Sequence, residues 1–507
     1  MTEQPPVGTG PPWARLDKRM LLVHPVTEVV KFIPVLIGSV ILGTSSGNPA
    51  WSIVPLVLIV GFALTRWFTT TYRVGPTHVE LRTGLVQRRE LSVPRSRIRS
   101  VDIESDLLHR ALGLSVVVIG TGQQADSGEK FKLDSLDARA VPTLRTELLA
   151  HTARPAPATP AVGVSEDEAA QALPAAREIG HWRPEWVRYA PLSLTGFAVI
   201  APIVGAAFQY GLGEVVFESD AAQDLGEGTV AAIVLVVLGL FAAIVLVVSL
   251  AACTRYLTTY FGLRVLHNGR TLHLRHGLFT TRQITLDLAR FRGATVNEPL
   301  LLRLSGAAEL EAIMVGENPR QKILPQAPRA AIERTLGELL APGATAGEPL
   351  APLSARLTRH GPAARRRRYF RALSPVVLLA FVVLAFDLEG PIPPWWWLLP
   401  GVTAIVAIAL AEDRYRGLGH TVLPRTATSP AWLITRSGCL DRDRDCLEAP
   451  GVIGWSVRQS FWQRRAGLAT VIAATAAGKK RYLVIDVPLD QAWPLIESVT
   501  PGALGSR

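Results

Sequence analysis

The sequence contains little cysteine. Its 507 residues include three, Cys253, Cys439 and Cys446, and no two of them form a CxxC pair. An odd count excludes a fully paired disulfide framework, and no cluster of histidines stands near them to complete a zinc site. We therefore expect three inert, reduced thiols and no bound metal ion.

Charged residues are also scarce. They make up 19% of the chain, against 49% hydrophobic residues, and a soluble protein of that composition would be poorly solvated. Part of the surface is therefore expected to face lipid. The net charge of +11 suits nucleic acid or anionic lipid, and the hydrophobicity favours lipid, so we expect no nucleic acid partner. The length predicts two to four domains.

No catalytic set is recognisable. The chain has no HExxH motif, no recurring Ser/His/Asp or Cys/His group and no ionisable residue in the middle of an apolar run. An intramembrane protease or a proton-coupled carrier needs such groups. We expect a protein without enzymatic activity or cofactor. A membrane transporter or exporter component, or a membrane-embedded enzyme, is the alternative. The polar, proline-rich N-terminus predicts no signal peptide.

What the chain has instead is long apolar runs in three close pairs. A helix needs roughly 20 apolar residues to cross the hydrocarbon core of a membrane, and the six runs approach or exceed that length. They predict a multi-pass membrane protein with three transmembrane helical hairpins. The runs cover about residues 27–45 and 50–66, 188–212 and 229–253, and 371–387 and 395–411.

Basic residues flank each pair of runs. Arg19 precedes the first pair and Arg66 follows it, and the other two pairs are flanked in the same way. The connections inside the pairs contain no Lys or Arg, and the longest, residues 211–228, is acidic. Lys and Arg favour the cytoplasmic side of a membrane. Each pair is therefore expected to go out and come back, which leaves both termini and all large hydrophilic segments in the cytoplasm.

The segment after each hairpin is repeated. Residues 77–113 match residues 270–306 without gaps, and a third copy follows at its own constant offset. Such self-similarity at fixed spacing is typical of a repeated structural unit. Two arginine positions recur in all three copies. They are Arg82, Arg275 and Arg436 at the first position, and Arg110, Arg303 and Arg464 at the second.

The recurring arginines have two interpretations. Each could bind a lipid phosphate or an acidic partner strand, because a guanidinium forms strong paired hydrogen bonds with such groups. Each could instead be half-buried in the fold and donate to turn carbonyls. Persistence of the arginines in the divergent third copy favours the second interpretation.

Each copy predicts strands followed by a helix. Residues 78–82 alternate in polarity and turn at Thr83 and Gly84, which is typical of a β-hairpin. A second hairpin is expected from residues 115–119 and 130–133. Amphipathic helices close the three copies at about residues 137–150, 327–340 and 490–499.

Each unit resembles the bacterial pleckstrin-homology (PH) domain of YdbS/YdbT-type membrane proteins. The features that carry the resemblance are the membrane hairpin, the basic strands, the Arg-x-x-Gly-hydrophobic pattern at Arg110–Gly113 and the final helix. The resemblance implies a strongly bent, seven-stranded sheet or open barrel with a C-terminal helix plugging one end. It also implies a link to envelope stress or antimicrobial resistance. The third copy departs most, because Asp443 and Asp445 replace Arg89 and Leu91, which predicts a lost basic edge there.

The α+β architecture expected from these observations is three transmembrane hairpins, each followed by a PH-like domain. A cytoplasmic tail covers residues 1–24, and two linkers, the first rich in Ala and Pro, cover 151–185 and 341–368. The hairpins cover 25–67, 186–254 and 369–412. The PH-like domains cover 68–150, 255–340 and 413–507.

A run of four arginines stands just before the third hairpin: Arg365, Arg366, Arg367 and Arg368. Beside a membrane span it is expected to fix topology and to attract anionic headgroups without specificity. We therefore expect a non-enzymatic scaffold of the bacterial plasma membrane that presents three cytoplasmic PH-like domains. Its expected partners are the lipid bilayer, the anionic lipid surface and an unknown protein, either a shorter PH-domain membrane protein or a second copy of the chain.

Overall fold

The computed structural model describes residues 13–48, 50–84, 88–98, 100–120, 131–149, 177–193, 205, 230–316, 319–341, 352–390, 392–426 and 429–502. The chain divides into two compact units. Unit 1 contains residues 1–177 and 262–288, and unit 2 contains residues 178–261 and 289–507. The second repeat therefore contributes strands to both units.

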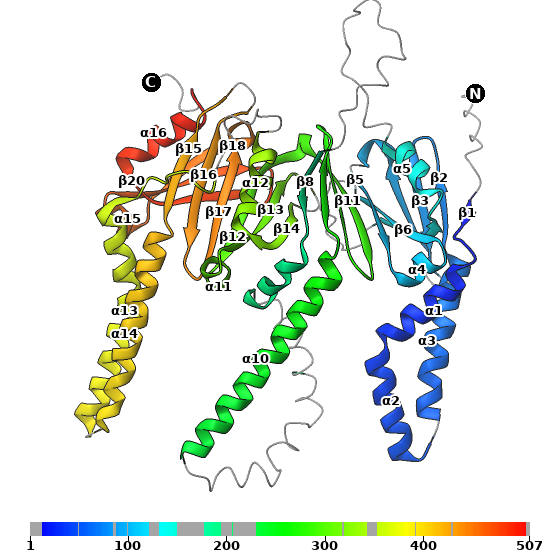
Figure 1. Cartoon of the computed structure of the whole chain (residues 1–507), viewed down its shortest axis with the longest axis horizontal. Coiled ribbons are helices and arrows are strands. Elements are labelled where there is room, and N and C mark those ends of the chain that lie inside the picture. The colour runs from blue at the N-terminus through cyan, green and yellow to red at the C-terminus, as the bar shows by residue number, and fades with distance from the viewer. Residues whose placement is uncertain are drawn as a thin grey trace, which may run out of the picture. The chain divides into compact units, whose positions relative to one another are not determined.

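Long apolar helices precede the β-rich segments (Figure 1). Unit 1 has α1 (Met20–Lys31), α2 (Ile33–Ser46) and α3 (Ala50–Thr69). Unit 2 has α10 (Val230–Tyr260), α13 (Gly361–Glu389) and α14 (Leu398–Arg416), with the 3-10 turns η3 (Pro184–Leu192) and η5 (Pro394–Trp397). Most of the run expected at 188–212 lies outside the described residues.

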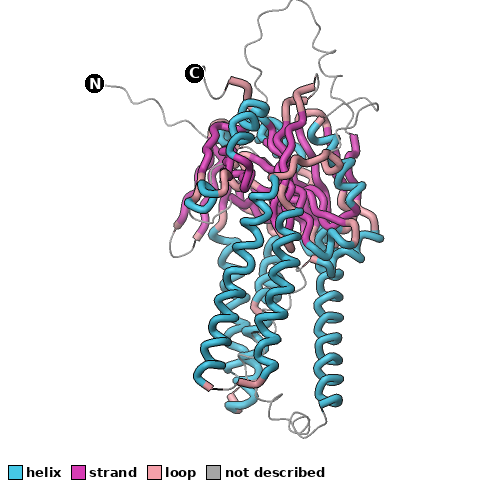
Figure 2. The backbone as a smooth tube through the Cα atoms, turned by 90° about the vertical axis from the view of Figure 1, so that its left-hand side faces the viewer, coloured by secondary structure: helices cyan, strands magenta, loops and turns pink. Residues whose placement is uncertain are grey.

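Three helices among the described residues are long and apolar enough to cross a membrane. They are Phe241–Tyr260, Gly361–Glu389 and Pro394–Arg416. Large apolar side chains point outward along them, for example Leu246, Phe381 and Ile405, which are all exposed. A helix that is apolar on its outer surface fits a lipid environment better than water. In both views these helices of unit 2 run away from the same side of its strands (Figures 1 and 2).

Two boundaries differ from the sequence expectation. Helix α10 continues to Tyr260, past the expected end of the second hairpin, and α13 begins at Gly361 rather than at residue 369. The run Arg365–Arg368 therefore lies inside a helix and not in a linker. The arginine run itself contains no proline or glycine, and Pro362 occupies the first turn of the helix, where a missing N–H costs little.

The strands of each copy form two antiparallel half-sheets. The strands of unit 1 are β1 (Ala14–Arg15), β2 (Thr71–Val74), β3 (His78–Thr83), β4 (Arg89–Pro94), β5 (Ser100–Ser105), β6 (Leu114–Gly120), β7 (Phe131–Asp137), β9 (Arg264–His267), β10 (Thr271–His276) and β11 (Thr281–Asp287). Strand β8 (Arg177–His181) lies at the boundary between the units. Those of unit 2 are β12 (Phe291–Pro299), β13 (Ala307–Met314), β14 (Arg320–Pro328), β15 (Gly419–Leu423), β16 (Trp432–Gly438), β17 (Asp441–Glu448), β18 (Val452–Arg458), β19 (Leu468–Thr475) and β20 (Arg481–Pro488).

Short helices complete each copy. After the first strand of the second half-sheet comes one helical turn, α4 (Leu107–Ala111), α11 (Leu300–Leu304) or α15 (Phe461–Arg465). After its last strand comes the closing helix, α5 (Val141–Leu149), α12 (Arg329–Leu340) or α16 (Leu489–Val499). The 3-10 turns η1 (Arg95–Arg97), η4 (Leu288–Arg290) and η6 (Ala449–Gly451) join the half-sheets.

The core of a copy lies between its two half-sheets and its closing helix. In the first copy Leu81 of β3, Val117 of β6 and Leu148 of α5 belong to one buried cluster. In the third copy Leu433 of β16 and Val471 of β19 pack with α16 in the same way. This arrangement agrees with the PH-like fold implied by the resemblance, including its C-terminal helix.

The sheets, however, do not stop at the end of a copy. In unit 1 the strand order is β7-β6-β5-β11-β10-β9, and in unit 2 it is β14-β13-β12-β17-β16-β15. Figure 1 shows β11 beside β5. The second half-sheet of one copy thus continues into the first half-sheet of the next. The resemblance implied one bent seven-stranded sheet or open barrel for each copy, and it did not imply this continuation, in which each edge strand gains backbone hydrogen bonds from its neighbour.

Candidate functional site

The first strand joint lies between β5 and β11 in unit 1. Its register places Thr281 opposite Ser105 and Arg282 opposite Glu104. The Arg282 guanidinium lies 3.5 Å from the Glu104 carboxylate. Opposite charges facing each other across two strands stabilise the pairing, so the joint is matched in charge as well as in backbone hydrogen bonding.

The second strand joint lies between β12 and β17 in unit 2. Here Asn297 stands opposite Asp443 and Thr295 opposite Asp445. The Thr295 hydroxyl donates to Asp445 over 2.7 Å, and the Asn297 amide donates to Asp443 over 2.9 Å. The acidic residues in which the third copy departs from the first therefore hold this joint. Burial raises the pKa of Asp445 to about 6.

The two joints have the same register. At the constant offsets of the repeat, Asn297 is the counterpart of Glu104, and Asp443 is the counterpart of Arg282. The pairs Glu104–Arg282 and Asn297–Asp443 are therefore equivalent. The same contact is built twice from different side chains, which makes it a property of the repeat.

The second recurring arginine lies at these joints. Arg110 on α4 donates to the carbonyl of Leu278, over 3.5 Å, and to the hydroxyl of Thr281, over 2.9 Å. Arg303 on α11 donates to the equivalent turn carbonyl, that of Cys439, over 3.3 Å. These arginines do bond turn carbonyls, but the turns belong to the next copy.

Asp413 connects the second joint to the end of α14. Arg303 lies 2.9 Å from its carboxylate, and the buried Arg442 of β17 also pairs with it. One carboxylate thus ties an arginine of the second copy to the third copy and its helix. The Arg303 and Asp413 side chains are largely shielded, which strengthens a charged hydrogen bond.

The third copy also has the strand and the arginine that form a joint in the first two copies, but no copy follows it in the chain. Strand β18 pairs with β19 on one side, and no described strand pairs with its other side. Arg464 on α15 is exposed, and its side chain contacts no partner within the described part of the chain. On β18, Ile453 is 74% exposed. The surface formed by β18 and Arg464 is hereafter the open joint.

The first recurring arginine does not have one role. Arg82 pairs with Glu90 over 3.2 Å and lies over the Trp13 ring. Arg275 is exposed on β10. Arg436 is half-buried, and its guanidinium donates to the Arg416 carbonyl over 2.7 Å. The sequence therefore groups three residues whose surroundings in the structure differ.

The run of four arginines is also divided. Arg367 and Arg368 both pair with Asp486, whose side chain is fully buried in the third copy. Arg365 lies 3.1 Å from Glu412 of α14, while Arg366 is exposed. Two of the four charges thus fix α13 to the sheet and are not available to headgroups.

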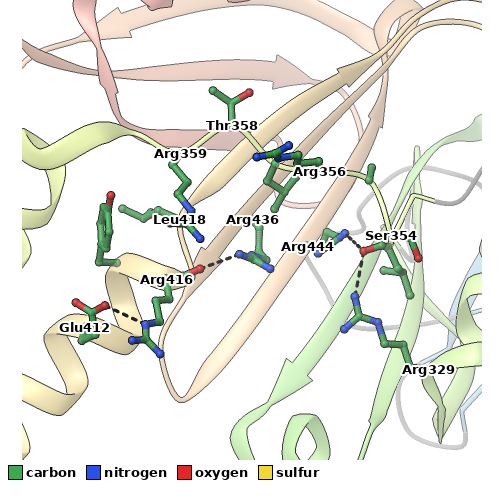
Figure 3. Close-up of a pocket in the computed structure, with 14 residues that line it drawn as sticks. Arg329, Ser354, Arg356, Thr358, Arg359, Glu412, Arg416, Leu418, Arg436 and Arg444 are labelled. Carbon is green, nitrogen blue, oxygen red and sulfur yellow. Dashed lines mark hydrogen bonds and ion pairs between the residues drawn. The ribbon is translucent and has the colours of Figure 1, made fainter.

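A second group of arginines surrounds a pocket of about 1150 Å³ in unit 2 (Figure 3). They come from α12, from the segment 352–360, from the last turn of α14 and from strands β16 and β17. The one carboxylate in the lining is Glu412, which pairs with Arg416 over 2.9 Å. The arginines are Arg329, Arg356, Arg359, Arg416, Arg436 and Arg444.

The floor of this pocket carries two like charges side by side. Arg436 and Arg444 stand directly opposite each other on β16 and β17, an arrangement that is unfavourable in a sheet. Burial, together with the charges of Arg444 and Arg442, lowers the pKa of Arg436 to about 10. Burial also lowers the pKa of Arg444. The buried carboxylate of Glu298 favours the charged form of both arginines and offsets part of this positive charge.

Sequence reasoning found Arg436 but missed the other arginines of the pocket. Arg442 and Arg444 alternate with the acidic residues of the same strand, so the two sets point to opposite faces of the sheet. That alternation was visible in the sequence. The contribution of Arg329, about a hundred residues away, was not.

The three cysteines do not lie together. Cys446 is buried, with the pKa of its thiol raised to about 12 by burial, and Cys253 and Cys439 are partly exposed. No group of three or more His, Cys, Asp or Glu side chains within the described residues could hold a metal ion.

Comparison with known proteins agrees with this architecture. The family model described as the bacterial PH domain matches residues 26–152, 199–340 and 369–500, one match for each repeat. No curated protein and no solved structure matched the chain. The three matches cover well over half of the sequence, and each includes an apolar helical segment as well as the strands after it. The chain therefore belongs to the bacterial PH domain family.

Proposed function

We propose that the protein is a non-enzymatic scaffold of the bacterial plasma membrane. Three helical hairpins hold the PH copies at the cytoplasmic surface, with both termini in the cytoplasm. The open joint of the third copy receives another PH-domain chain. The observation that carries this proposal is the strand joint, which is built twice within the chain and offered a third time by β18 and Arg464.

The joints support a topology with an even number of crossings between copies. Strand pairing requires both partners to lie on the same side of a membrane. The pairing of β12 with β17 supports a crossing out and back by α13 and α14. The pairing of β5 with β11 likewise supports a second crossing before α10, for which the apolar run predicted at 188–212 is the candidate.

Exposed apolar residues on the short helices support contact with the membrane surface. Each of α4, α11 and α15 exposes two large apolar side chains, and in Figure 1 α11 and α15 lie on the side of the strands from which the long helices extend. Apolar residues at that level reach the headgroup region. They are Leu107 and Leu108, Leu301 and Leu304, and Phe461 and Trp462.

The charge pattern of the open joint favours a partner other than a second copy. By the repeat offsets, Arg458 occupies the place of Glu104, and Arg89 occupies the place of Arg282. Docking β18 on β4 of a second copy would therefore place Arg458 opposite Arg89, and like charges in that position are destabilising. A shorter PH-domain membrane protein with an acidic residue at this strand position fits better.

Site-specific photo-crosslinking in native membranes tests the proposal. A photoreactive residue at Ser456, on β18, should crosslink to a chain that mass spectrometry identifies as a PH-domain protein. Arg464→Ala should lower the yield. A photoreactive residue at Thr470, on the interior strand β19, is the control and should give no such product. The proposal would be contradicted if no PH-domain chain were found, or if Arg464→Ala left the crosslinking yield unchanged.

A transporter or exporter component, or a membrane-embedded enzyme, is the alternative. Stoichiometric zinc in the purified protein, or nucleotide hydrolysis abolished by one substitution, would favour it. The resemblance to YdbT-type proteins extends the proposal to envelope stress or antimicrobial resistance, which deletion of the gene tests by susceptibility measurements.

A further inference from the structure

The arginine pocket of Figure 3 does not take part in the strand joints and calls for a separate explanation. Arg356 and Arg359 are exposed, and no described residue is within hydrogen-bonding or ion-pairing distance of either guanidinium. Figure 3 shows both around the same space as Arg436. Two unpaired guanidinium groups beside a buried like-charged pair are an arrangement that favours a bound anion.

This arginine pair has few acceptors among the described residues. Within them the half-buried Arg436 donates to the carbonyls of Gly417 and Arg416 alone. Arg444 donates to the carbonyls of Pro352 and Leu353, and its Nε is buried without an acceptor among the described residues. Carbonyl oxygens orient a guanidinium but bring no negative charge. The orientation is therefore built. The nearby buried carboxylate of Glu298 offsets part of the positive charge, but it also lies 3.8 Å from Arg329, so the arginines of the pocket outnumber the carboxylates near them.

The position of the pocket points to the membrane surface. Glu412, Tyr415 and Arg416 line it and lie in the last two turns of the apolar helix segment Pro394–Arg416. If that segment spans the membrane, the pocket opens at the level of the phospholipid headgroups. Arginine is suited to phosphate because its planar fork matches two phosphate oxygens at once.

We propose that this pocket binds an anion that carries two phosphoryl groups. Arg436 and Arg444 form its floor, and Arg356 and Arg359 close on it from the segment 352–360. Four guanidinium groups offer more donors than one phosphate group can accept in paired hydrogen bonds, so an anion with two phosphate groups fits them better. Two sources share this chemistry: the headgroup of a diphosphatidylglycerol lipid and a soluble diphosphate. The inference is independent of the open joint.

Binding is measured on the full chain in detergent with inorganic pyrophosphate as the soluble probe. For the lipid source, the chain is reconstituted in nanodiscs of phosphatidylcholine with or without diphosphatidylglycerol. It is then released from the nanodiscs, and native mass spectrometry measures how much diphosphatidylglycerol it retains. The test variant is Arg356→Gln/Arg359→Gln, which replaces two exposed side chains that make no hydrogen bond or ion pair with the described residues. The control, Arg425→Gln/Arg481→Gln, removes two exposed arginines of the same unit outside the pocket.

The wild type should bind pyrophosphate or retain diphosphatidylglycerol, and the test variant should weaken that binding at least about tenfold, the effect of losing one or two charged hydrogen bonds. The control should behave like the wild type. Pyrophosphate binding alone identifies a soluble ligand, and lipid retention alone identifies the headgroup; both support the pocket. The proposal would be overturned if the wild type bound neither pyrophosphate nor diphosphatidylglycerol, or if the test variant bound as tightly as the wild type.

Discussion

Arg303 and Arg464 are the same residue of the repeat in two different situations. Arg303 donates to the Cys439 carbonyl and to Asp413. Arg464 forms part of the open joint. Arg303→Ala should lower the free energy of unfolding by about 1–3 kcal/mol, because it removes the charged hydrogen bonds to the Cys439 carbonyl and to Asp413, which then pairs with Arg442 alone. Arg464→Ala should leave it unchanged. Thermal unfolding of the two variants checks this, and equal losses of stability would refute the assignment of these arginines to joints.

His360 and His420 form a buried pair that predicts acid sensitivity. His360 Nδ1 donates to the Ile485 carbonyl over 2.8 Å, so its Nε2 must accept from His420 Nδ1 over 2.9 Å. Burial lowers the pKa of His420 to about 4 and lowers that of His360. In the unfolded chain both titrate near 6.5. The unfolded state then binds more protons, so stability falls as the pH drops from about 6.5 to about 4.

His420→Asn keeps a donor at this position and removes the proton uptake of His420, while His360 can still take up a proton. Thermal unfolding of this variant should depend less on pH in that window, by up to about 3 kcal/mol. Asp445, whose pKa is raised to about 6, acts in the opposite direction, and comparing variant with wild type cancels its contribution. Identical pH profiles would exclude the histidine pair as the acid-sensitive group.

At the scale of elements, two equivalent glycines separate a closed joint from an open one. Gly293 has φ +152°, and a Cβ there would meet the Cys446 carbonyl oxygen of the next copy at 2.1 Å. Its counterpart Gly454, on β18, has nothing within 4 Å. Gly293→Ala should therefore destabilise the chain by roughly 2–4 kcal/mol, and Gly454→Ala by less than about 1 kcal/mol.

Thermal unfolding measures both glycine variants. If the second copy did not pair with the third through β12 and β17, the two substitutions would have similar effects. The variant Gly454→Ala also tests partner binding at the open joint, because it should reduce crosslinking from β18 while leaving the fold intact.

The elements and the hairpins within a copy could be predicted from the sequence, and the pairing between copies could not. The Val-rich run at residues 115–119 and the run at 130–133 predicted a hairpin whose strands match β6 and β7. Alternation states which face of a strand is buried, but backbone edges have no side-chain pattern. The continuation of β5 into β11 was therefore invisible. For the same reason Asp445, which bonds Thr295 across a joint, was interpreted as the loss of a basic edge.

At the scale of the whole molecule, the open joint predicts how the chain associates. The wild type should sediment as a single species in detergent, because Arg458 and Arg89 repel in a β18–β4 contact between two copies. Arg89→Glu or Arg458→Glu turns this pair into an attractive one. A gain of about 1–2 kcal/mol should strengthen association roughly 5- to 30-fold. The double variant Arg89→Glu/Arg458→Glu should return to the wild-type behaviour. Single variants that stay unassociated would contradict the predicted register.

The strand joints require all three PH copies to lie on the same side of the membrane, because paired strands cannot lie on opposite sides of it. Accessibility of single cysteines in intact cells, in a chain whose three native cysteines are replaced, tests this most directly. Cysteines at Asp220 and Glu389, in the connections inside the second and third hairpins, should react with an impermeant reagent from outside. Cysteines at Asp126 and Lys480, in the first and third PH copies, should react only after permeabilisation. Labelling of Asp126 and Lys480 from opposite sides, or the reverse pattern throughout, would contradict the account.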